Sequence, residues 1–167
     1  DEWEKNKEIS RDFWKKLGEN GFLCPQVDEK YGGLNADFGF AVITSEEMDR
    51  VSVGMVGVGL HNDIVIPYLE SYGTEEQKEK WLPGAVSGDL ISAVAMTEPN
   101  TGSDLANIQT TAVLDGDHYV VNGEKTFITN GHIADIYIVA VKTDTEVKPA
   151  HRGISLLVIE AGTPGFT

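Results

Sequence analysis

Hydrophobic residues recur every three or four positions through most of the first half of the chain, and every second position through much of the second half. The first spacing is that of a helix with one buried face, and the second is that of a strand whose side chains alternate between two faces. The period changes at about residue 89. The pattern predicts an α+β protein, with a helical domain over residues 1–89 and a β domain over residues 90–167.

Three amphipathic helices are expected along the first 73 residues. The apolar positions expected on their buried faces are Trp3, Ile9, Phe13, Trp14 and Leu17 in the first helix, Phe38, Ala41, Val42, Ser45 and Met48 in the second, and Ile64, Val65, Tyr68, Leu69 and Tyr72 in the third. Asn20-Gly21 is a stop signal for the first helix, and Gly32-Gly33 breaks the loop that follows. Pro67 is compatible with the third helix if it lies in the first turn.

A fourth helix is expected after Thr74. Thr74 and Gln77 have the spacing of a capping box, in which each side chain bonds the backbone N–H of the other residue. Pro83 and Gly84 are expected to limit this helix, because proline removes a backbone donor and clashes with the preceding turn.

Short alternating segments with turn signals between them predict the strands of the β domain. The expected strands cover residues 90–96, 108–114, 118–122, 125–129, 136–142 and 153–160. Asp115-Gly116-Asp117 and Asn122-Gly123 are hairpin signals. The pattern favours an antiparallel meander over a parallel α/β sheet.

Charge and cysteine content exclude several classes of protein. The chain has 13 basic and 27 acidic residues, so its formal net charge is −14. An acidic surface repels phosphate backbones, which argues against nucleic-acid binding. The sequence contains no run of 18 apolar residues, so no transmembrane helix is predicted. The first residues do not show the pattern of a signal or transit peptide. Cys24, the single cysteine, cannot form an internal disulfide and is expected to be a packing residue.

Most familiar catalytic and metal-binding motifs are absent from the sequence. Residues 54–59 read GMVGVG, which has the wrong order of glycines for a dinucleotide loop and follows no predicted strand. No Walker A, H-E-x-x-H or C-x-x-C motif is present, so we expect no metal site. The histidines are scattered and are expected to be ordinary surface or core residues; they are His61, His118, His132 and His151.

Two polar segments at strand ends stand out as candidate chemistry. Residues 95–104 read AMTEPNTGSD, and residues 125–131 read KTFITNG. Strand alternation would place Thr97 on a face of small residues, and Phe127 and Thr129 together on one face. Two interpretations remain open. The hydroxyl groups could bond neighbouring strands, or a planar ligand could lie against Phe127 with the loop N–H groups binding a phosphate.

This pair of segments resembles the signature of the acyl-CoA dehydrogenases, T-E-P-x-x-G-S-D followed by N-G-x-K-x-[WF]-I-[TS]-N-G. The resemblance extends along nearly the whole chain, through YGGLNADF, YGTEEQKEKWLP and HRGISLLVIEAGTPG. Phe127, where many members have tryptophan, and the N-terminal run are most similar to the long-chain branch.

The resemblance implies a fold and a cofactor. The fold would be an N-terminal helical domain and an antiparallel, β-barrel-like middle domain, without the C-terminal four-helix domain that completes the family fold. The cofactor would be FAD. Its pyrimidine edge would meet Met96, through its backbone, and Thr97. Phe127 would flank the ring system, and Ile128 and Thr129 would line it, with Thr129 near N5. Gly102 and Ser103 would lie near the pyrophosphate and the entrance for acyl-CoA, with Ser103 also binding substrate.

The resemblance also implies a reaction, α,β-dehydrogenation of an acyl-CoA thioester with transfer of electrons to an electron-transferring flavoprotein. The catalytic glutamate of the family would lie beyond residue 167, so the 167 residues alone are expected to be inactive, and Glu98 is expected to be structural. The full-length form would be a homotetramer, in the bacterial cytoplasm or the mitochondrial matrix. Alternatives are an acyl-CoA oxidase or flavin monooxygenase of the same fold, and a non-catalytic assembly module that has lost FAD.

Overall fold

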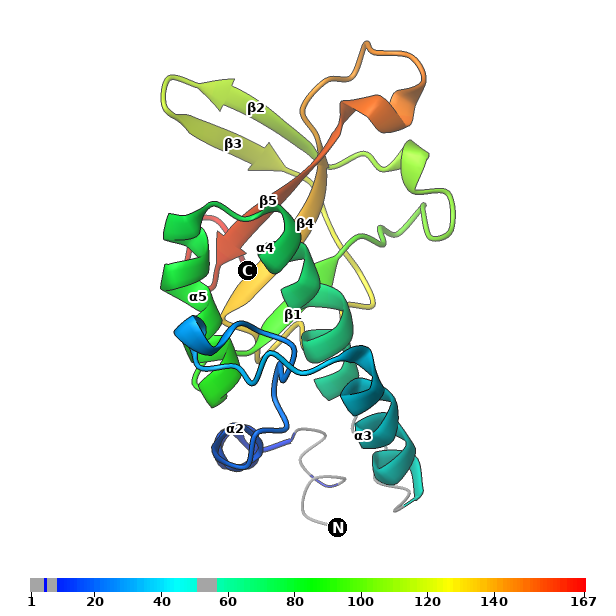
Figure 1. Ribbon diagram of the computed structural model, residues 1–167. Coiled ribbons are helices and arrows are strands. Elements are labelled where there is room, and N and C mark those ends of the chain that lie inside the picture. Colours follow the sequence, from blue (N-terminus) through cyan, green and yellow to red (C-terminus); the bar gives the residue numbers. More distant parts are fainter. Residues whose placement is uncertain (1–4, 6–8, 51–56) are drawn as a thin grey trace. The chain divides into compact units, whose positions relative to one another are not determined.

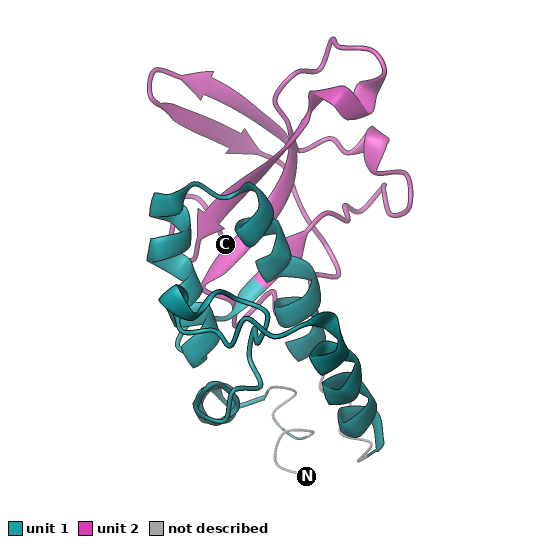
Figure 2. Cartoon of the chain, in the orientation of Figure 1, with its two compact units in different colours: residues 1–92 teal, residues 93–167 magenta. Residues whose placement is uncertain are grey.

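The chain divides into two compact units, residues 1–92 and residues 93–167 (Figure 2). The computed structural model describes residues 5, 9–50 and 57–167. Helices make up the first unit, and strands make up the second (Figure 1). The predicted order of a helical region followed by a β region is confirmed.

The helices of the first unit follow the predicted order. They are α2 (Arg11–Glu19), α3 (Phe38–Arg50), α4 (Ile66–Tyr72) and α5 (Glu75–Ser87), with a 3-10 turn η1 (Glu29–Tyr31) and a π-helix η2 (Leu60–Val65). Trp14 and Leu17 are the buried residues of α2, and Asn20 caps its C-terminus. Gly21 then has a φ of 75°, which glycine adopts without strain. Trp3, expected on the first helix, lies outside the described residues.

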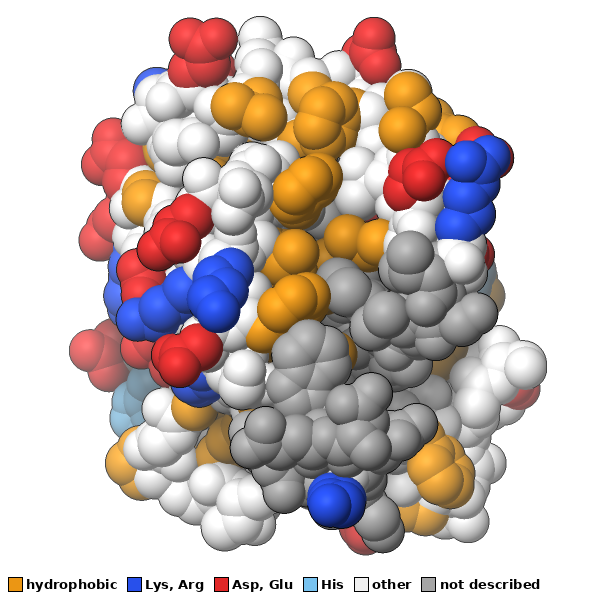
Figure 3. All heavy atoms as spheres, turned by 90° about the horizontal axis from the view of Figure 1, so that it is seen from below, with side chains coloured by type: hydrophobic (Ala, Val, Ile, Leu, Met, Phe, Trp, Pro, Cys, Tyr) orange, Lys and Arg blue, Asp and Glu red, His pale blue; other side chains and the backbone are white. Residues whose placement is uncertain are grey.

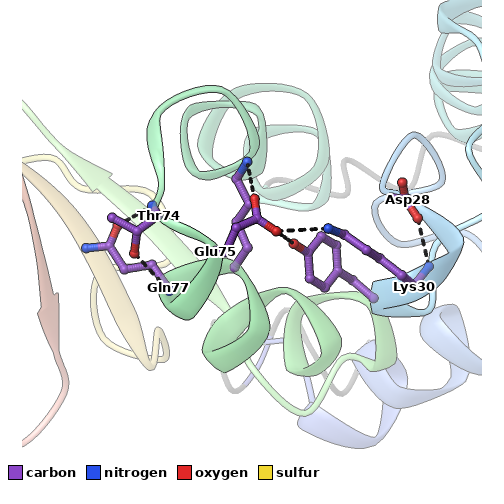
Figure 4. Close-up of polar contacts among 7 residues, drawn as sticks. Asp28, Lys30, Thr74, Glu75 and Gln77 are labelled. Atoms are coloured by element: carbon purple, nitrogen blue, oxygen red, sulfur yellow. Dashed lines mark hydrogen bonds and ion pairs between the residues drawn. The ribbon is translucent and has the colours of Figure 1, made fainter.

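The capping box at the start of α5 forms as predicted (Figure 4). The Thr74 hydroxyl accepts from the Gln77 N–H at 3.2 Å, and the Gln77 side chain accepts from the Thr74 N–H at 2.9 Å. The Glu75 carboxylate accepts from Lys30 Nζ and from the Tyr31 hydroxyl, each at 2.9 Å. These bonds hold the loop that contains η1 against the first turn of α5.

The helix expected over the run EEQKEKWLPGAVSG, residues 75–88, forms, but the prediction that Pro83 limits it is wrong. Pro83 lies inside α5, which continues to Ser87 and ends at Gly88. Ala85 and Val86, which follow the proline, are both buried. Proline in a helix interior costs about 3 kcal/mol, and burial of the last turn in the core offsets that cost.

The apolar face expected around α4 is only partly correct. Val65 and Leu69 are buried, but Ile64 is 47% exposed and Tyr72 is 81% exposed. The helical spacing assumed 3.6 residues per turn, whereas residues 60–65 form a π-helix with a wider turn. The wider turn changes which side chains face the core, so His61 and Asn62 are buried instead. Pro67 lies in the first turn, as the sequence required.

Helix α3 forms where predicted, but none of its residues is buried. Phe38 is 78% exposed and Val42 is 50% exposed, so the expected burial of these two side chains is wrong within the described chain. Ala41 and Met48, two other members of the predicted face, line a small pocket with Asn62. Figure 3 shows hydrophobic side chains at the surface of the face seen from below, in a row between charged residues.

The second unit contains one five-stranded sheet. Its strands are β1 (Ser92–Ala95), β2 (Thr111–Asp115), β3 (His118–Asn122), β4 (Ile136–Lys142) and β5 (Ile154–Glu160). The β2–β3 hairpin and the β4–β5 pair are antiparallel, as expected. The predicted antiparallel meander is wrong, because β1 neighbours β4 and not β2, and because β2 pairs with β4 in parallel at Thr111 and Lys142. Residues 123–135 carry the chain past β2, so β4 does not lie beside β3.

Strand β4 is the centre of the second unit. It neighbours β1, β2 and β5, and every residue from Ile136 to Val141 is buried. A strand buried on both faces reads as a continuous apolar run and not as an alternating one. The strand order places the C-terminal end of β1, where the first polar segment begins, in the same sheet as this core.

Candidate functional site

The loop after β1 is a closed turn. The Glu98 N–H donates to the Thr101 carbonyl at 2.9 Å, and the Thr101 N–H donates to the Glu98 carbonyl at 3.1 Å. Pro99 and Asn100 form the tip. The Thr101 hydroxyl donates to the Asn107 carbonyl at 3.3 Å. These bonds give residues 98–101 a defined shape and account for the polar side chain of Thr101.

The second polar segment is not the strand that its sequence predicts. Residues 125–129 have no ladder partner, and Phe127 has a φ of 55°. A turn follows, in which the Gly131 N–H donates to the Ile128 carbonyl at 2.9 Å and Asn130 has a φ of 64°. Because a left-handed residue interrupts the alternation, the prediction that Phe127 and Thr129 share one strand face is wrong.

The structure nevertheless brings the two segments together. The Thr126 N–H donates to the Thr97 carbonyl at 2.9 Å. Lys125 Nζ donates to the Met96 carbonyl at 3.0 Å and to Glu98 Oε1 at 2.8 Å. Backbone and side chain of the second segment therefore contact three consecutive residues of the first.

Glu98 lies at the centre of this junction. Only 5% of its side chain is exposed, and its carboxylate also accepts from the backbone N–H groups of Gln109, at 2.6 Å, and Thr110, at 2.9 Å. Burial alone would raise the pKa of Glu98, but the Lys125 ammonium and the N–H donors outweigh it and lower the pKa to about 2. A carboxylate bound in this way cannot accept a substrate proton near neutral pH.

Sequence reasoning missed Lys125, which is only 10% exposed at its side chain. The available signal was its place in a strand-like run inside one of the two motifs. Lysine is almost never buried without a partner, so a lysine in such a run indicates a buried acidic residue elsewhere.

Several polar side chains of the two segments make no hydrogen bond within the described part of the chain. The hydroxyl groups of Thr97, Ser103 and Thr129 have no hydrogen-bond partner within the described part of the chain. Gly102 has nothing within 4 Å of where a Cβ would lie, and it does not have the left-handed φ that would require glycine. Among the residues that the structure describes, neither packing nor backbone conformation explains a glycine at this position.

Phe127 is the most exposed large apolar side chain of the described residues, at 92%. A bulky residue in the left-handed region costs of order 1–3 kcal/mol. An exposed ring on a strained backbone gains nothing from folding of this chain. Of the other predicted residues, Met96 and Ile128 are partly exposed. The two segments therefore carry hydroxyl groups without a partner among the described residues and an exposed aromatic ring, which are groups that a planar ligand with polar edges requires.

Comparison with known proteins identifies the family. The family profile described as "Acyl-CoA dehydrogenase, N-terminal domain" matches residues 1–89, and that described as "Acyl-CoA dehydrogenase, middle domain" matches residues 93–167. The chain belongs to the acyl-CoA dehydrogenase family.

Similar proteins agree with this assignment. The long-chain specific acyl-CoA dehydrogenase of Mus musculus is 44% identical over 99% of this chain and 38% of its own length. The crystal structure of an acyl-CoA dehydrogenase from Geobacillus kaustophilus matches with a TM-score of 0.97 and 68% identity, over 99% of this chain and 44% of that one. A structure described as PigA with FAD and proline matches with a TM-score of 0.89 and 34% identity, over 98% and 43%. The chain thus spans about two fifths of each of these relatives.

A search for membrane-spanning helices, limited to the residues that the structure describes, finds none that is long and apolar enough.

Proposed function

We propose that this chain is the N-terminal and middle part of an FAD-dependent acyl-CoA dehydrogenase, and that its two polar segments hold the flavin. The observation that carries the proposal is that two loops bonded to each other hold the exposed ring of Phe127 and three hydroxyl groups that have no partner among the described residues. A flavin has an apolar face and a polar edge, and these groups fit both. The similarity to PigA, whose structure is described with FAD, supports the same cofactor.

Each predicted residue has a role that its chemistry allows. Thr97 and the backbone of Met96 would bind the pyrimidine edge, Thr129 would bind near N5, and Ile128 would line the ring. Phe127 would flank the ring and bury its own face in doing so. Gly102 and Ser103 would lie at the pyrophosphate and at the acyl-CoA entrance, where a missing side chain lets a bulky phosphate approach the backbone.

The chemistry that bound FAD supplies is acceptance of the hydride that leaves the β-carbon of an acyl-CoA thioester. The residues of this chain would stabilise the charge of the reduced flavin and hold the flavin in position. Hydroxyl and N–H donors at a flavin edge stabilise the negative charge that accompanies reduction, at no cost in reorganisation because the loops already hold them. Glu98 would not abstract the substrate proton, because its carboxylate is fully bonded. The resemblance to the family implies that a glutamate outside these residues would take that role in the full-length protein.

The proposal extends to the setting of the enzyme. We expect electrons to leave to an electron-transferring flavoprotein, the full-length protein to be a homotetramer, and its role to be in fatty-acid β-oxidation. Relatives include a mitochondrial enzyme and a protein of Bacillus subtilis, so the mitochondrial matrix and the bacterial cytoplasm are the two compartments we propose.

The direct test is to express the full-length protein with FAD and to add acyl-CoA thioesters of different chain lengths without oxygen. We expect a yellow protein whose flavin absorbance bleaches on addition of substrate and returns slowly in air. Rapid reoxidation by air would identify an oxidase or monooxygenase instead. A colourless protein that takes up no FAD would contradict the proposal and favour a non-catalytic module.

Thr97→Ala in the same protein is expected to lower the reduction potential of bound FAD. A hydrogen bond to a charged group contributes ~1.5–3 kcal/mol, which for a two-electron couple is roughly 30–60 mV. Potentiometric titration measures the shift. Thr145→Ala, an exposed loop threonine of the same unit, is the matched control and should leave the potential unchanged. An unchanged potential in Thr97→Ala would show that this hydroxyl does not contact the flavin.

A further inference from the structure

The ammonium group of Lys125 bonds the residues on both sides of Thr97, which we place at the flavin edge. Lys125 Nζ donates to the carbonyl of Met96 and to the carboxylate of Glu98, which precede and follow Thr97. The Thr126 N–H takes the carbonyl of Thr97 itself, at 2.9 Å. Residues 96, 97 and 98 therefore each accept one hydrogen bond from residues 125 and 126, and the Thr97 hydroxyl is left free within the described chain.

Removing Lys125 would leave a single bond across this junction between residues 96–98 and residues 125–126. A lysine ammonium has three donors, and two of them are used here. No other side chain of similar length supplies donors to a carbonyl and a carboxylate from one compact atom, since the donors of arginine are spread over a planar fork. The lysine therefore sets the distance between two segments that come from different parts of the chain.

A purely structural account of Lys125 meets a difficulty. Burying an ion pair costs desolvation that its own attraction often fails to repay, and apolar residues of similar volume often stabilise a protein equally well. The pair lies at the base of both flavin-facing segments and its side chains are 10% and 5% exposed. The position of the Lys125–Glu98 pair between the two segments accounts for a buried lysine better than a gain in stability does.

We propose that Lys125 is a positioning residue, which holds Met96 and Thr97 where their polar groups meet the flavin, with Glu98 as its fixed anchor. The inference rests on the proposed function, because it assigns Lys125 a role toward the cofactor proposed there. Lys125 itself acts through the loop and not by contact with the flavin.

The test uses the full-length protein with Lys125→Met, which keeps an unbranched side chain one heavy atom shorter and removes its charge and donors. Lys125→Arg is the conservative variant, and Lys15→Met is the matched control because Lys15 forms an exposed pair with Asp89 in the first unit. The measurements are the dissociation constant for FAD, the reduction potential of bound FAD, and amide hydrogen exchange of residues 96–101 and 125–131 without FAD.

We expect Lys125→Met to raise loop exchange rates and the FAD dissociation constant at least tenfold, and to shift the potential in the direction of Thr97→Ala. Lys125→Arg should restore part of the affinity, and Lys15→Met should match the parent in all three measurements. Parental affinity and potential in Lys125→Met would overturn the inference, even if the loop exchanged faster, because the lysine would then be structural only.

A variant that does not fold and a parent protein that binds no FAD are two further outcomes, and each can be told apart from a failure of the inference. If Lys125→Met does not fold, the double variant Glu98→Gln/Lys125→Met removes the uncompensated buried charge, and it should fold and bind FAD at least tenfold more weakly. Parental binding by the double variant would overturn the inference. A parent protein that binds no FAD would overturn the proposed function and this inference together, whereas a parent that binds FAD and variants that bind equally would overturn the inference alone.

Discussion

Glu98→Gln is expected to lower the free energy of unfolding of the second unit by about 3–5 kcal/mol, the usual cost of removing one partner of a buried ion pair. The amide cannot balance the charge of Lys125, whose side chain is 10% exposed. It also replaces one acceptor oxygen by a donor, so one of the Gln109 and Thr110 N–H groups or Lys125 loses its acceptor. The loss should appear in the hydrogen exchange of β4 amides, which report the core of this unit.

The matched control for this prediction is Glu124→Gln, the same substitution at an exposed residue next to Lys125. Surface substitutions of this kind usually change stability by less than about 0.5 kcal/mol. Equal effects of the two substitutions would contradict the buried ion pair as the structure shows it.

The same carboxylate predicts a dependence on pH. The pKa of Glu98 falls from an ordinary 4.5 to about 2 in the folded state. Between pH 4.5 and 2, Glu98 is therefore protonated in the unfolded chain and ionised in the folded chain. The stabilisation is present above pH 4.5 and is lost as the pH falls from there toward 2. A difference of this size corresponds to about 3 kcal/mol, and Glu98→Gln should lack this part of the acid sensitivity.

Acidification from pH 6.5 to pH 4 is expected to destabilise the first unit by about 3 kcal/mol through His61 alone. His61 is fully buried, with Nε2 3.1 Å from the Ala85 carbonyl and Nδ1 2.7 Å from the Ser92 hydroxyl. Burial lowers the pKa of His61 from 6.5 to about 4, against a smaller opposing effect of the Ala85 carbonyl. Nδ1 also accepts from the Ser92 N–H at 3.2 Å, which a protonated nitrogen could not do.

Stability falls at low pH because the folded and unfolded states bind different numbers of protons at His61. Between pH 6.5 and 4 the unfolded state binds a proton at this histidine and the folded state does not, so stability falls as the pH is lowered and the loss is complete near pH 4. His61→Gln can donate to the Ala85 carbonyl and accept from Ser92 but does not titrate. Hydrogen exchange of α5 amides at several pH values should therefore show a flatter profile for His61→Gln. His151→Gln, at an exposed position, should retain the parental profile, and parallel profiles for the parent and His61→Gln would contradict the prediction.

Much of the fold could be predicted because the signals are local. The capping box at Thr74 needs only residues three positions apart, and the bounds of β3 and β4 match the alternating or apolar runs that predicted them. Predictions went wrong where distant contacts outweigh local preference. Burial of Ala85 and Val86 carries α5 past Pro83, and the π-helix at residues 60–65 changes the buried face that regular spacing predicts.

The candidate site shows the same division. Short motifs single out Thr97, Ser103 and Phe127, and their roles toward a flavin stay predictions. Alternation predicted a strand through Phe127, but Phe127 has a left-handed backbone, between the hydrogen bond from Thr126 to Thr97 and the turn at residues 128–131. The bond between Thr126 and Thr97 joins distant parts of the chain, so no local pattern contains it.

Neighbouring residues specify the family, the two segments that carry the candidate chemistry, and the order of helices and strands apart from residues 125–129, because periodicity and short motifs depend on residues close in the chain. The buried pair of Lys125 and Glu98 around Thr97 depends on the fold instead, since its two residues lie 27 positions apart. A charge is buried only where the fold supplies its partner, and here that partner comes from a distant part of the chain.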